Sequence, residues 1–190
     1  MVIEGRRERE RSARRELIIT TARSIAEAEG WEAVTTRRLS SEIEYSQPVI
    51  YKHFAGMEDI AEAVAVEGFT ELATVIRNAR AGTETAEQAL TRTAEAYLDF
   101  ARTSPAVYDA MFSRPTTLHF AAADTPPQLM AAFGELREVV EPLGEDEDFD
   151  TLTEVVFAAL HGLATLRRGG RLRPDHDTDR IRMLVRQITT

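Results

Sequence analysis

The stretch Thr35–Phe54, TTRRLSSEIEYSQPVIYKHF, has the pattern of two short helices joined by a tight turn. The hydroxyl of Thr35 is placed to cap the first helix by accepting a hydrogen bond from a backbone N–H of the first turn. Leu39 and Ile43 follow four residues apart, a spacing that puts both side chains on one face of a helix. We therefore expect a short amphipathic helix with this face in a core.

A second helix is expected directly after a break at Glu44–Tyr45. The hydroxyl of Ser46 is placed to cap it by binding the N–H three residues later, and Pro48 suits the second helical position, where its missing N–H costs nothing. Ile50 and Phe54 recur at helical spacing and should anchor the helix to its neighbours. Such a pair predicts a helix-turn-helix with its second helix in a DNA major groove.

The same stretch resembles the DNA-binding domain of the tetracycline-repressor (TetR) family of bacterial transcriptional regulators. The residues that carry the resemblance are Thr35, Leu39, Ser46, Tyr51, His53 and Phe54, with SQPVIYKHF as the most specific piece. It extends over about residues 15–66. The remainder resembles the family in its helical layout and in FAALHGLATL around His161, which is similar to a W-x-x-x-H-G signature of one subgroup with Phe157 in place of Trp.

Three positions depart from the family pattern. Glu44 stands at the turn where members usually carry Gly, so this residue must reach the turn conformation without the freedom of glycine. Tyr45 replaces a small aliphatic residue, and Met57 replaces a Lys that contacts phosphate in many members. These departures affect how the domain docks on DNA and leave the predicted fold unchanged.

The resemblance and the helix-turn-helix pattern together imply a set of DNA-contacting residues. We expect phosphate contacts from Thr35, Tyr51, Lys52 and His53, base-edge contacts from Gln47 and Val49, and further contacts from Thr36, Arg37, Ser46 and Pro48. Six arginines lie between Arg6 and Arg15, interspersed with glutamates. This arm either extends the first helix and reaches phosphates or a minor groove, or remains a solvated arm.

The distribution of charge favours approach to DNA through the N-terminal module. The chain has 190 residues and a net charge of −9. Residues 1–54 carry ten basic and nine acidic side chains, whereas the remainder carries thirteen basic and twenty-three acidic ones. The acidic body repels DNA, although acidic bodies are also common for solubility alone. No signal peptide, long apolar run or cysteine is present, so we expect a cytoplasmic protein without a membrane partner.

Helical apolar spacing continues to the end of the chain, and no alternating strand pattern is present. We expect an all-α protein of about nine helices, with a three-helix DNA-binding domain over residues 1–56 and a helical ligand-binding and dimerisation domain over residues 57–190. The fourth helix begins near Glu58 and is long enough to connect the two domains. No flexible linker is expected between them.

Sequence motifs for catalysis or metal binding are absent. The chain has no G-x-S-x-G elbow, phosphate-binding glycine loop or H-E-x-x-H, and its four histidines show no metal-ligand spacing. We therefore expect no catalytic residue, no metal and no cofactor. A helical enzyme remains an alternative, because some catalytic sites carry no motif.

In the TetR family the second domain encloses a pocket for a small molecule, which implies one here. We expect it to be bounded by Phe69, Leu72, Tyr97, Phe100, Tyr108, Met111, Phe133 and His161. For His161 the alternative is a core or interface histidine bonded to a backbone carbonyl. The effector itself is not indicated by the sequence.

The last two helices should pack against their symmetry mates in a homodimer. The interface candidates are Leu160, Leu163, Ile181, Leu184, Val185 and Ile188. The expected function is a transcriptional repressor that binds a palindromic double-stranded DNA operator as a dimer and is released by a small molecule. The main alternative is a helix-turn-helix regulator that senses a protein or nothing.

Overall fold

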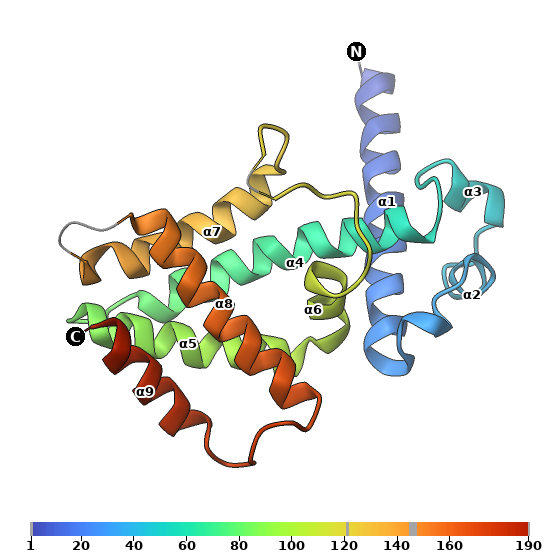
Figure 1. The fold of residues 1–190 in the computed structure, drawn as a ribbon. Helices are drawn as coiled ribbons and strands as arrows, with labels where there is room; N and C mark the ends of the chain where they lie inside the picture. Colours follow the sequence, from blue (N-terminus) through green and yellow to red (C-terminus); the bar gives the residue numbers. More distant parts are fainter. Residues whose placement is uncertain (1, 121, 145–147, 190) are drawn as a thin grey trace. The chain divides into compact units, whose positions relative to one another are not determined.

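The computed structural model describes residues 2–120, 122–144 and 148–189, and every regular element in these ranges is a helix (Figure 1). The predicted all-α class is confirmed, with nine α-helices in the described residues. In chain order the elements are α1 (Val2–Glu29), η1 (Trp31–Ala33), α2 (Thr36–Glu42), α3 (Gln47–Tyr51), α4 (Met57–Arg80), α5 (Ala86–Thr103), α6 (Pro105–Phe112), α7 (Pro127–Val140), η2 (Glu141–Leu143), α8 (Phe149–Arg168) and α9 (Asp177–Ile188).

The chain divides into two compact units. The first consists of residues 1–68 and 104–118, and the second of residues 69–103 and 119–190. The first unit thus contains α6 in addition to the helix-turn-helix, and the unit boundary falls within α4. A division into functional domains at residues 56 and 57 stays a prediction.

The first unit is built on α1, α2 and α3, which form the expected small core (Figure 1). Apolar residues at helical spacing are buried in it: Ile18, Ala22, Ile25, Ala26, Leu39, Ile43, Ile50 and Phe54. Leu17, which was expected to belong to the apolar stripe of α1, is 42% exposed. Gly30 follows the end of α1 with a φ of 84°, as expected of a terminating glycine, although its ψ of 163° is extended rather than left-handed helical.

Helix α6 is fastened to α1 and to the segment that follows it. The carboxylate of Glu27 accepts hydrogen bonds from the first free N–H groups of α6, those of Ala106 and Val107, both at 3.1 Å. The indole N–H of Trp31 donates to the carbonyl oxygen of Ala106 at 2.9 Å. A carboxylate at a helix N-terminus satisfies unpaired N–H groups and interacts favourably with the helix dipole. These bonds explain why α6 belongs to the first unit.

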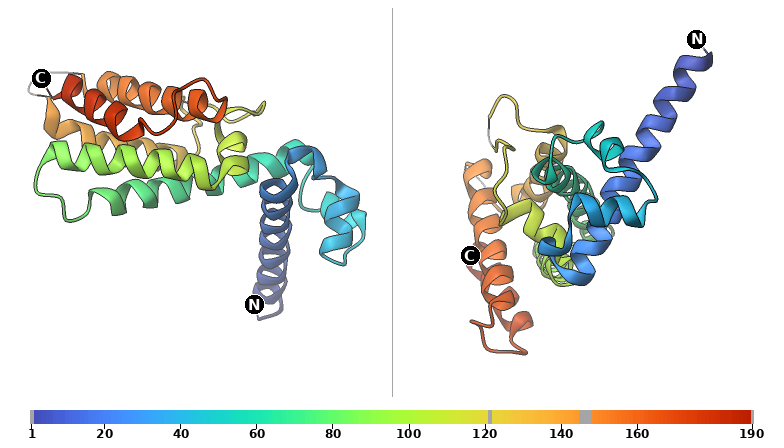
Figure 2. Two further views of the ribbon diagram at one scale, coloured as in Figure 1. Left: turned by 90° about the horizontal axis from the view of Figure 1, so that it is seen from below. Right: turned by 90° about the vertical axis from the view of Figure 1, so that its right-hand side faces the viewer.

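The second unit is organised around α5, which contacts α7, α8 and α9 (Figure 2). One face of α5 is buried along its length: Leu90, Thr93, Ala94, Tyr97, Leu98 and Ala101. In α7 the apolar residues Leu129, Ala132, Leu136, Val139 and Val140 are also buried, whereas Phe133 is 36% exposed. An apolar residue at the margin of a helical stripe can point either way, and only the packed structure decides which.

An ion-pair cluster joins the C-terminal end of α4 to α7 within the second unit. Glu135 is 9% exposed and accepts hydrogen bonds from Arg77 and Arg80, both at 2.8 Å. Arg80 also pairs with Glu138. Burial alone would raise the pKa of Glu135, but the bonds from the two arginines outweigh this effect and hold the pKa below its ordinary value.

Candidate nucleic-acid interface

Helix α2 is capped and anchored as its sequence predicts. The hydroxyl of Thr35 accepts a hydrogen bond from the N–H of Arg38 at 3.1 Å, which satisfies one unpaired donor of the first turn. Leu39 is fully buried and fixes the inner face of the helix. Thr35 and Arg37 are consequently exposed, and Thr36 is half-buried. All three predicted contact residues of this segment therefore retain accessible surface.

The turn between α2 and α3 depends on Glu44. This residue has a φ of 55°, in the left-handed region that glycine enters without penalty. The N–H of the next residue, Tyr45, bonds to the carbonyl oxygen of Ser40 at 3.1 Å, and the Tyr45 ring is 37% exposed. The glutamate therefore takes the turn conformation expected of the usual glycine.

Helix α3 starts differently from the prediction. Ser46 makes no capping bond with its side chain. The N–H of Val49 bonds instead to the backbone carbonyl oxygen of Ser46 at 2.9 Å, so the predicted hydroxyl cap is wrong. Pro48 lies in the first turn as expected. The unbonded Ser46 hydroxyl is exposed and available to an external acceptor.

The outer face of α3 presents its polar residues to solvent. Ile50 and Phe54 are 1% and 2% exposed and hold the helix to the core. On the other faces Ser46, Gln47, Pro48, Tyr51 and Lys52 are exposed, with Tyr51 at 55%, while Val49 and His53 are half-buried. A short helix anchored on one face, with amide, hydroxyl and ammonium groups on the others, suits contacts with base edges and phosphates.

His53 lies in a strongly positive part of the first unit. Burial lowers the pKa of His53, and four neighbouring cations lower this pKa further. These cations are Arg11, Arg14, Arg15 and Lys52. Three of them come from α1, and the guanidinium carbon of Arg15 lies 4.9 Å from the centroid of the Phe54 ring, so residues 11–15 of that helix lie beside the end of α3. A phosphate would be attracted to this cluster.

The predicted pocket residues are divided between the two units. Phe69, Leu72, Tyr97 and Phe100 are buried in the second unit, Phe133 is exposed there, and Tyr108 and Met111 are buried in the first unit. His161 is half-buried and stacks on Phe157, with ring centroids 5.7 Å apart. Burial lowers the pKa of His161, as does the nearby charge of Arg168.

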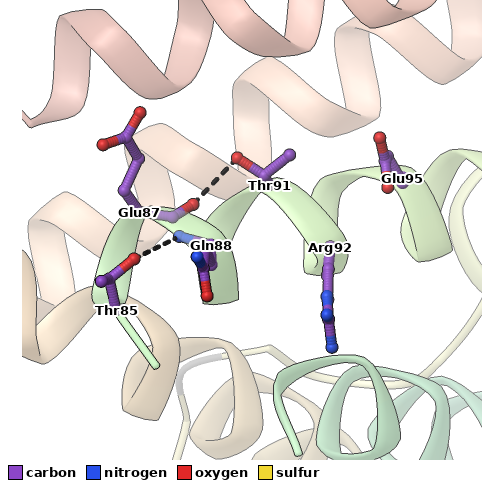
Figure 3. Close-up of a pocket in the computed structure, with 6 residues that line it drawn as sticks. All are labelled: Thr85, Glu87, Gln88, Thr91, Arg92 and Glu95. Carbon is purple, nitrogen blue, oxygen red and sulfur yellow. Dashed lines mark hydrogen bonds between the residues drawn. The ribbon is translucent and has the colours of Figure 1, made fainter. Parts of the chain in front are cut away.

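Two surface hollows of the second unit do not involve the predicted pocket residues. One, of about 580 Å³, lies along the outer face of α5 and is lined by Thr85, Glu87, Gln88, Thr91, Arg92 and Glu95 (Figure 3). The carboxylates of Glu87 and Glu95 point to one side of α5 and Arg92 to the other, so the charged groups do not converge. The second hollow, of about 270 Å³, lies between α4 and α7. Both are shallow and open.

Half of the predicted dimer-interface residues are already covered by their own chain. Leu160, Ile181 and Val185 are 0%, 3% and 2% exposed within the second unit. Their side chains therefore belong to its core and present no surface to a partner. Leu163, Leu184 and Ile188 are half-buried.

Comparison with known proteins agrees with this geometry. Residues 18–64 match the family model "Bacterial regulatory proteins, tetR family", and residues 90–189 match "Tetracyclin repressor-like, C-terminal domain". The chain is 27% identical over 173 residues to the uncharacterized HTH-type transcriptional regulator Rv0681 of Mycobacterium tuberculosis, an alignment covering 88% of this chain and 75% of the relative.

Solved structures share the fold. A Rhodococcus sp. RHA1 protein of unknown function has a TM-score of 0.76 at 23% identity, covering 92% of this chain and 93% of its own. The regulator FadR from Bacillus subtilis, in complex with stearoyl-CoA, has a TM-score of 0.66 at 11% identity, covering 92% and 97%. With both parts matched by family models, the second over residues 90–189, the chain belongs to the TetR family of bacterial transcriptional regulators.

Proposed function

We propose that the protein is a repressor that binds a palindromic operator as a homodimer in the cytoplasm, without enzymatic activity, and leaves DNA when a small molecule occupies the second unit. The observation that carries the proposal is the exposed polar face of α3, a helix held to the core by the buried side chains of Ile50 and Phe54. Selection of binding sites from a random duplex pool tests it. We expect an inverted repeat whose half-sites lie about 34–36 Å, or a multiple of this distance, apart.

Gln47 and Tyr51 are proposed to have different roles on DNA. Replacing Gln47 with Ala should relax discrimination at one base position by about 1–3 kcal/mol, because an amide can pair bidentately with a base edge. Replacing Tyr51 with Phe should weaken binding to every sequence alike, because a phosphate contact carries no base information. If the Gln47→Ala variant selects the same sites as the wild type with undiminished preference, the assigned base contact is incorrect.

An exposed apolar stripe on α8 supports the proposed dimer. Val155 and Leu166 are 51% and 40% exposed, and Ala158 and Gly162 fall on the same helix face. An added Cβ at Gly162 would meet nothing within 4 Å in its own chain, so a partner helix could approach closely there. We propose that this stripe, together with the half-buried Leu163, Leu184 and Ile188, forms the subunit interface.

The composition of α8 is consistent with this assignment. By length and composition α8 could also cross a membrane, and only 22% of its apolar window is buried within the chain. A second copy of the helix would remove the same apolar surface from water.

The dimer proposal is tested by placing a charge on the stripe. Gly162→Glu should convert the protein to monomers in sedimentation equilibrium at micromolar concentration, because a carboxylate at a close helix contact would be desolvated. Gly134→Glu in α7 is the matched control, since Gly134 is also helical with nothing within 4 Å of an added Cβ. A wild-type protein that sediments as a monomer would remove the basis of the proposal.

A ligand site in the second unit is supported by one orphan polar group. The side chain of Thr93 is fully buried, and its hydroxyl has no hydrogen-bond partner in the described structure. Buried polar groups are normally satisfied, so an orphan of this kind can mark the place of a bound molecule. We propose that the effector is a mainly apolar molecule accommodated near Thr93 and among Phe69, Leu72, Tyr97 and Phe100.

The ligand switch requires that effector and operator weaken each other's binding by the same factor. Acyl-CoA compounds are a sensible first panel, since the FadR neighbour holds stearoyl-CoA. A compound that raises the melting temperature is then titrated into protein with and without the selected duplex. A typical coupling of about 1–3 kcal/mol corresponds to roughly 5- to 150-fold. Equal affinities in both titrations would favour a regulator that does not respond to that ligand.

A further inference from the structure

We infer that the arginine row of α1, formed by Arg7, Arg11 and Arg14, binds the DNA backbone beside the major groove that α3 enters. The inference rests on the proposed DNA binding and deepens it by adding a second contact surface. It assigns a partner to a segment upstream of the first family match, which begins at residue 18.

The arginine row continues the buried face of α1 toward its N-terminus. α1 is one uninterrupted helix, Val2–Glu29. With 3.6 residues per turn, spacings of three and four residues keep side chains on one face. The series Arg7, Arg11, Arg14, Ile18, Ala22 and Ile25 has this spacing throughout. Ile18, Ala22 and Ile25 are buried, so the three arginines project on the side of α1 that is buried within the first unit.

The row begins next to the end of α3. The guanidinium of Arg15 lies over the ring of Phe54, with its central carbon 4.9 Å from the ring centroid. Arg11 and Arg14 are close enough to His53 for their charges to act on its ring. At a rise of 1.5 Å per residue, the row continues for about 16 Å from Ile18 to Arg7. A duplex seated against α3 therefore has cationic side chains next to it along α1.

The balance of charge indicates that DNA binding needs this row. Residues 1–15 carry six arginines and three glutamates, whereas residues 16–54 carry four basic and six acidic side chains. The helix-turn-helix core is thus net negative, and the segment before it supplies the positive charge of the module. Attraction to phosphates provides most of the sequence-independent affinity of a DNA-binding protein.

Among residues 5–16, whose side chains the structure describes, the glutamates pair with only part of the arginines. Glu10 binds Arg6 at 2.8 Å and approaches Arg14 at 4.0 Å. Arg7 and Arg11 form no ion pair with another described residue and are exposed. Residues 5–16 contain no large apolar side chain, and an amphipathic membrane-binding helix needs an apolar face. A polyanion such as duplex DNA therefore fits this surface better than a lipid bilayer.

The test compares two pairs of arginines on opposite sides of the same helix. The variant Arg7→Gln/Arg11→Gln removes two charges from the proposed face, and Arg6→Gln/Arg9→Gln removes two from the other sides. Both keep a good helix former at each position. Full-length proteins are titrated by fluorescence anisotropy with the selected duplex and with an unrelated duplex of equal length. The salt concentration is varied from about 50 to 300 mM KCl, and circular dichroism verifies that helix content is retained.

We expect the slope of log affinity against log salt to fall by about 1.8 per protomer for Arg7→Gln/Arg11→Gln on both duplexes. The change for Arg6→Gln/Arg9→Gln should be less than half as large. Equal changes for the two variants, or no change for either, would overturn the inference. A wild-type protein that enriches no site would refute the proposed function instead, and the slopes on the unrelated duplex would still decide the role of the row.

Discussion

Gly68 is the position where one added carbon should have the clearest effect on the first unit. An ideal Cβ at this helical glycine would lie 2.5 Å from Cγ1 of Val107 and 2.7 Å from Sδ of Met111, both in α6. The Met111 side chain is flexible and can move, but Val107 is β-branched and stiff. Gly68→Ala must therefore shift α6 relative to α4 or force Val107 out of its rotamer.

The expected size of the effect follows from two opposing contributions. Overpacking in a close-packed core typically costs about 1–3 kcal/mol. Replacing glycine with alanine inside a helix stabilises it by about 1 kcal/mol. We therefore expect Gly68→Ala to reduce the free energy of unfolding by up to about 2 kcal/mol. Gly134→Ala, where an added Cβ meets nothing within 4 Å, should increase it by about 1 kcal/mol.

Urea unfolding of the two variants measures this difference. Circular dichroism reports on helices of both units, and the fluorescence of Trp31, the only tryptophan, reports on the first unit. Because Trp31 bonds to Ala106, its fluorescence should also register the displacement of α6. If Gly68→Ala stabilises the protein as much as Gly134→Ala does, the close contact between α4 and α6 is refuted.

Three further substitutions have defined outcomes. Thr93→Val should raise the free energy of unfolding of the ligand-free protein by about 1–2 kcal/mol, measured in urea, because it removes a buried hydroxyl without a partner. Glu135→Gln should lower it by about 1.5 kcal/mol at pH 7. The lowered pKa of Glu135 means that this stabilisation is present above the unfolded pKa of about 4.3 and lost as pH falls through the folded pKa, so unfolding curves of variant and wild type should converge in acid. Phosphates beside His53 would raise its lowered pKa, so DNA affinity should increase from about pH 8 to 6, and His53→Gln should flatten this dependence in anisotropy titrations.

Local signals in the sequence predicted the helix-turn-helix well. The Thr35 cap, the buried Leu39 and the break at Glu44 all depend on residues within one or two helical turns, and the structure contains each of them. The Ser46 cap failed for an equally local reason. The N–H of Val49 can bond to either the hydroxyl or the carbonyl oxygen of Ser46, and residue type does not distinguish these two acceptors.

The apolar spacing of the sequence does not predict which face of α8 packs against the core. Apolar residues occur around most of this helix, including Val155 and Leu166 on the exposed face and Leu160 on the buried one. When a helix is apolar nearly all round, its pattern does not indicate which side faces the core. Leu160 was consequently predicted at the dimer interface, although its own chain buries it.

The placement of α6 bears on how the proposed effector signal would pass from the second unit to the helix-turn-helix. If the domains divided at residue 56, α4 would be their only covalent connection. With α6 in the first unit, the chain passes between the units three times: within α4, between α5 and α6, and after residue 118. Glu27 and Trp31 bind the start of α6, where it continues directly from α5.

A movement at the end of α5 would therefore act on α1 through these hydrogen bonds as well as through α4. Glu27→Gln retains the shape of the side chain but removes the negative charge that favours the N-terminus of α6. If α6 transmits the signal, this variant should still bind the operator but lose part of the coupling between effector and DNA. Unchanged coupling in the paired titrations would leave α4 as the principal connection.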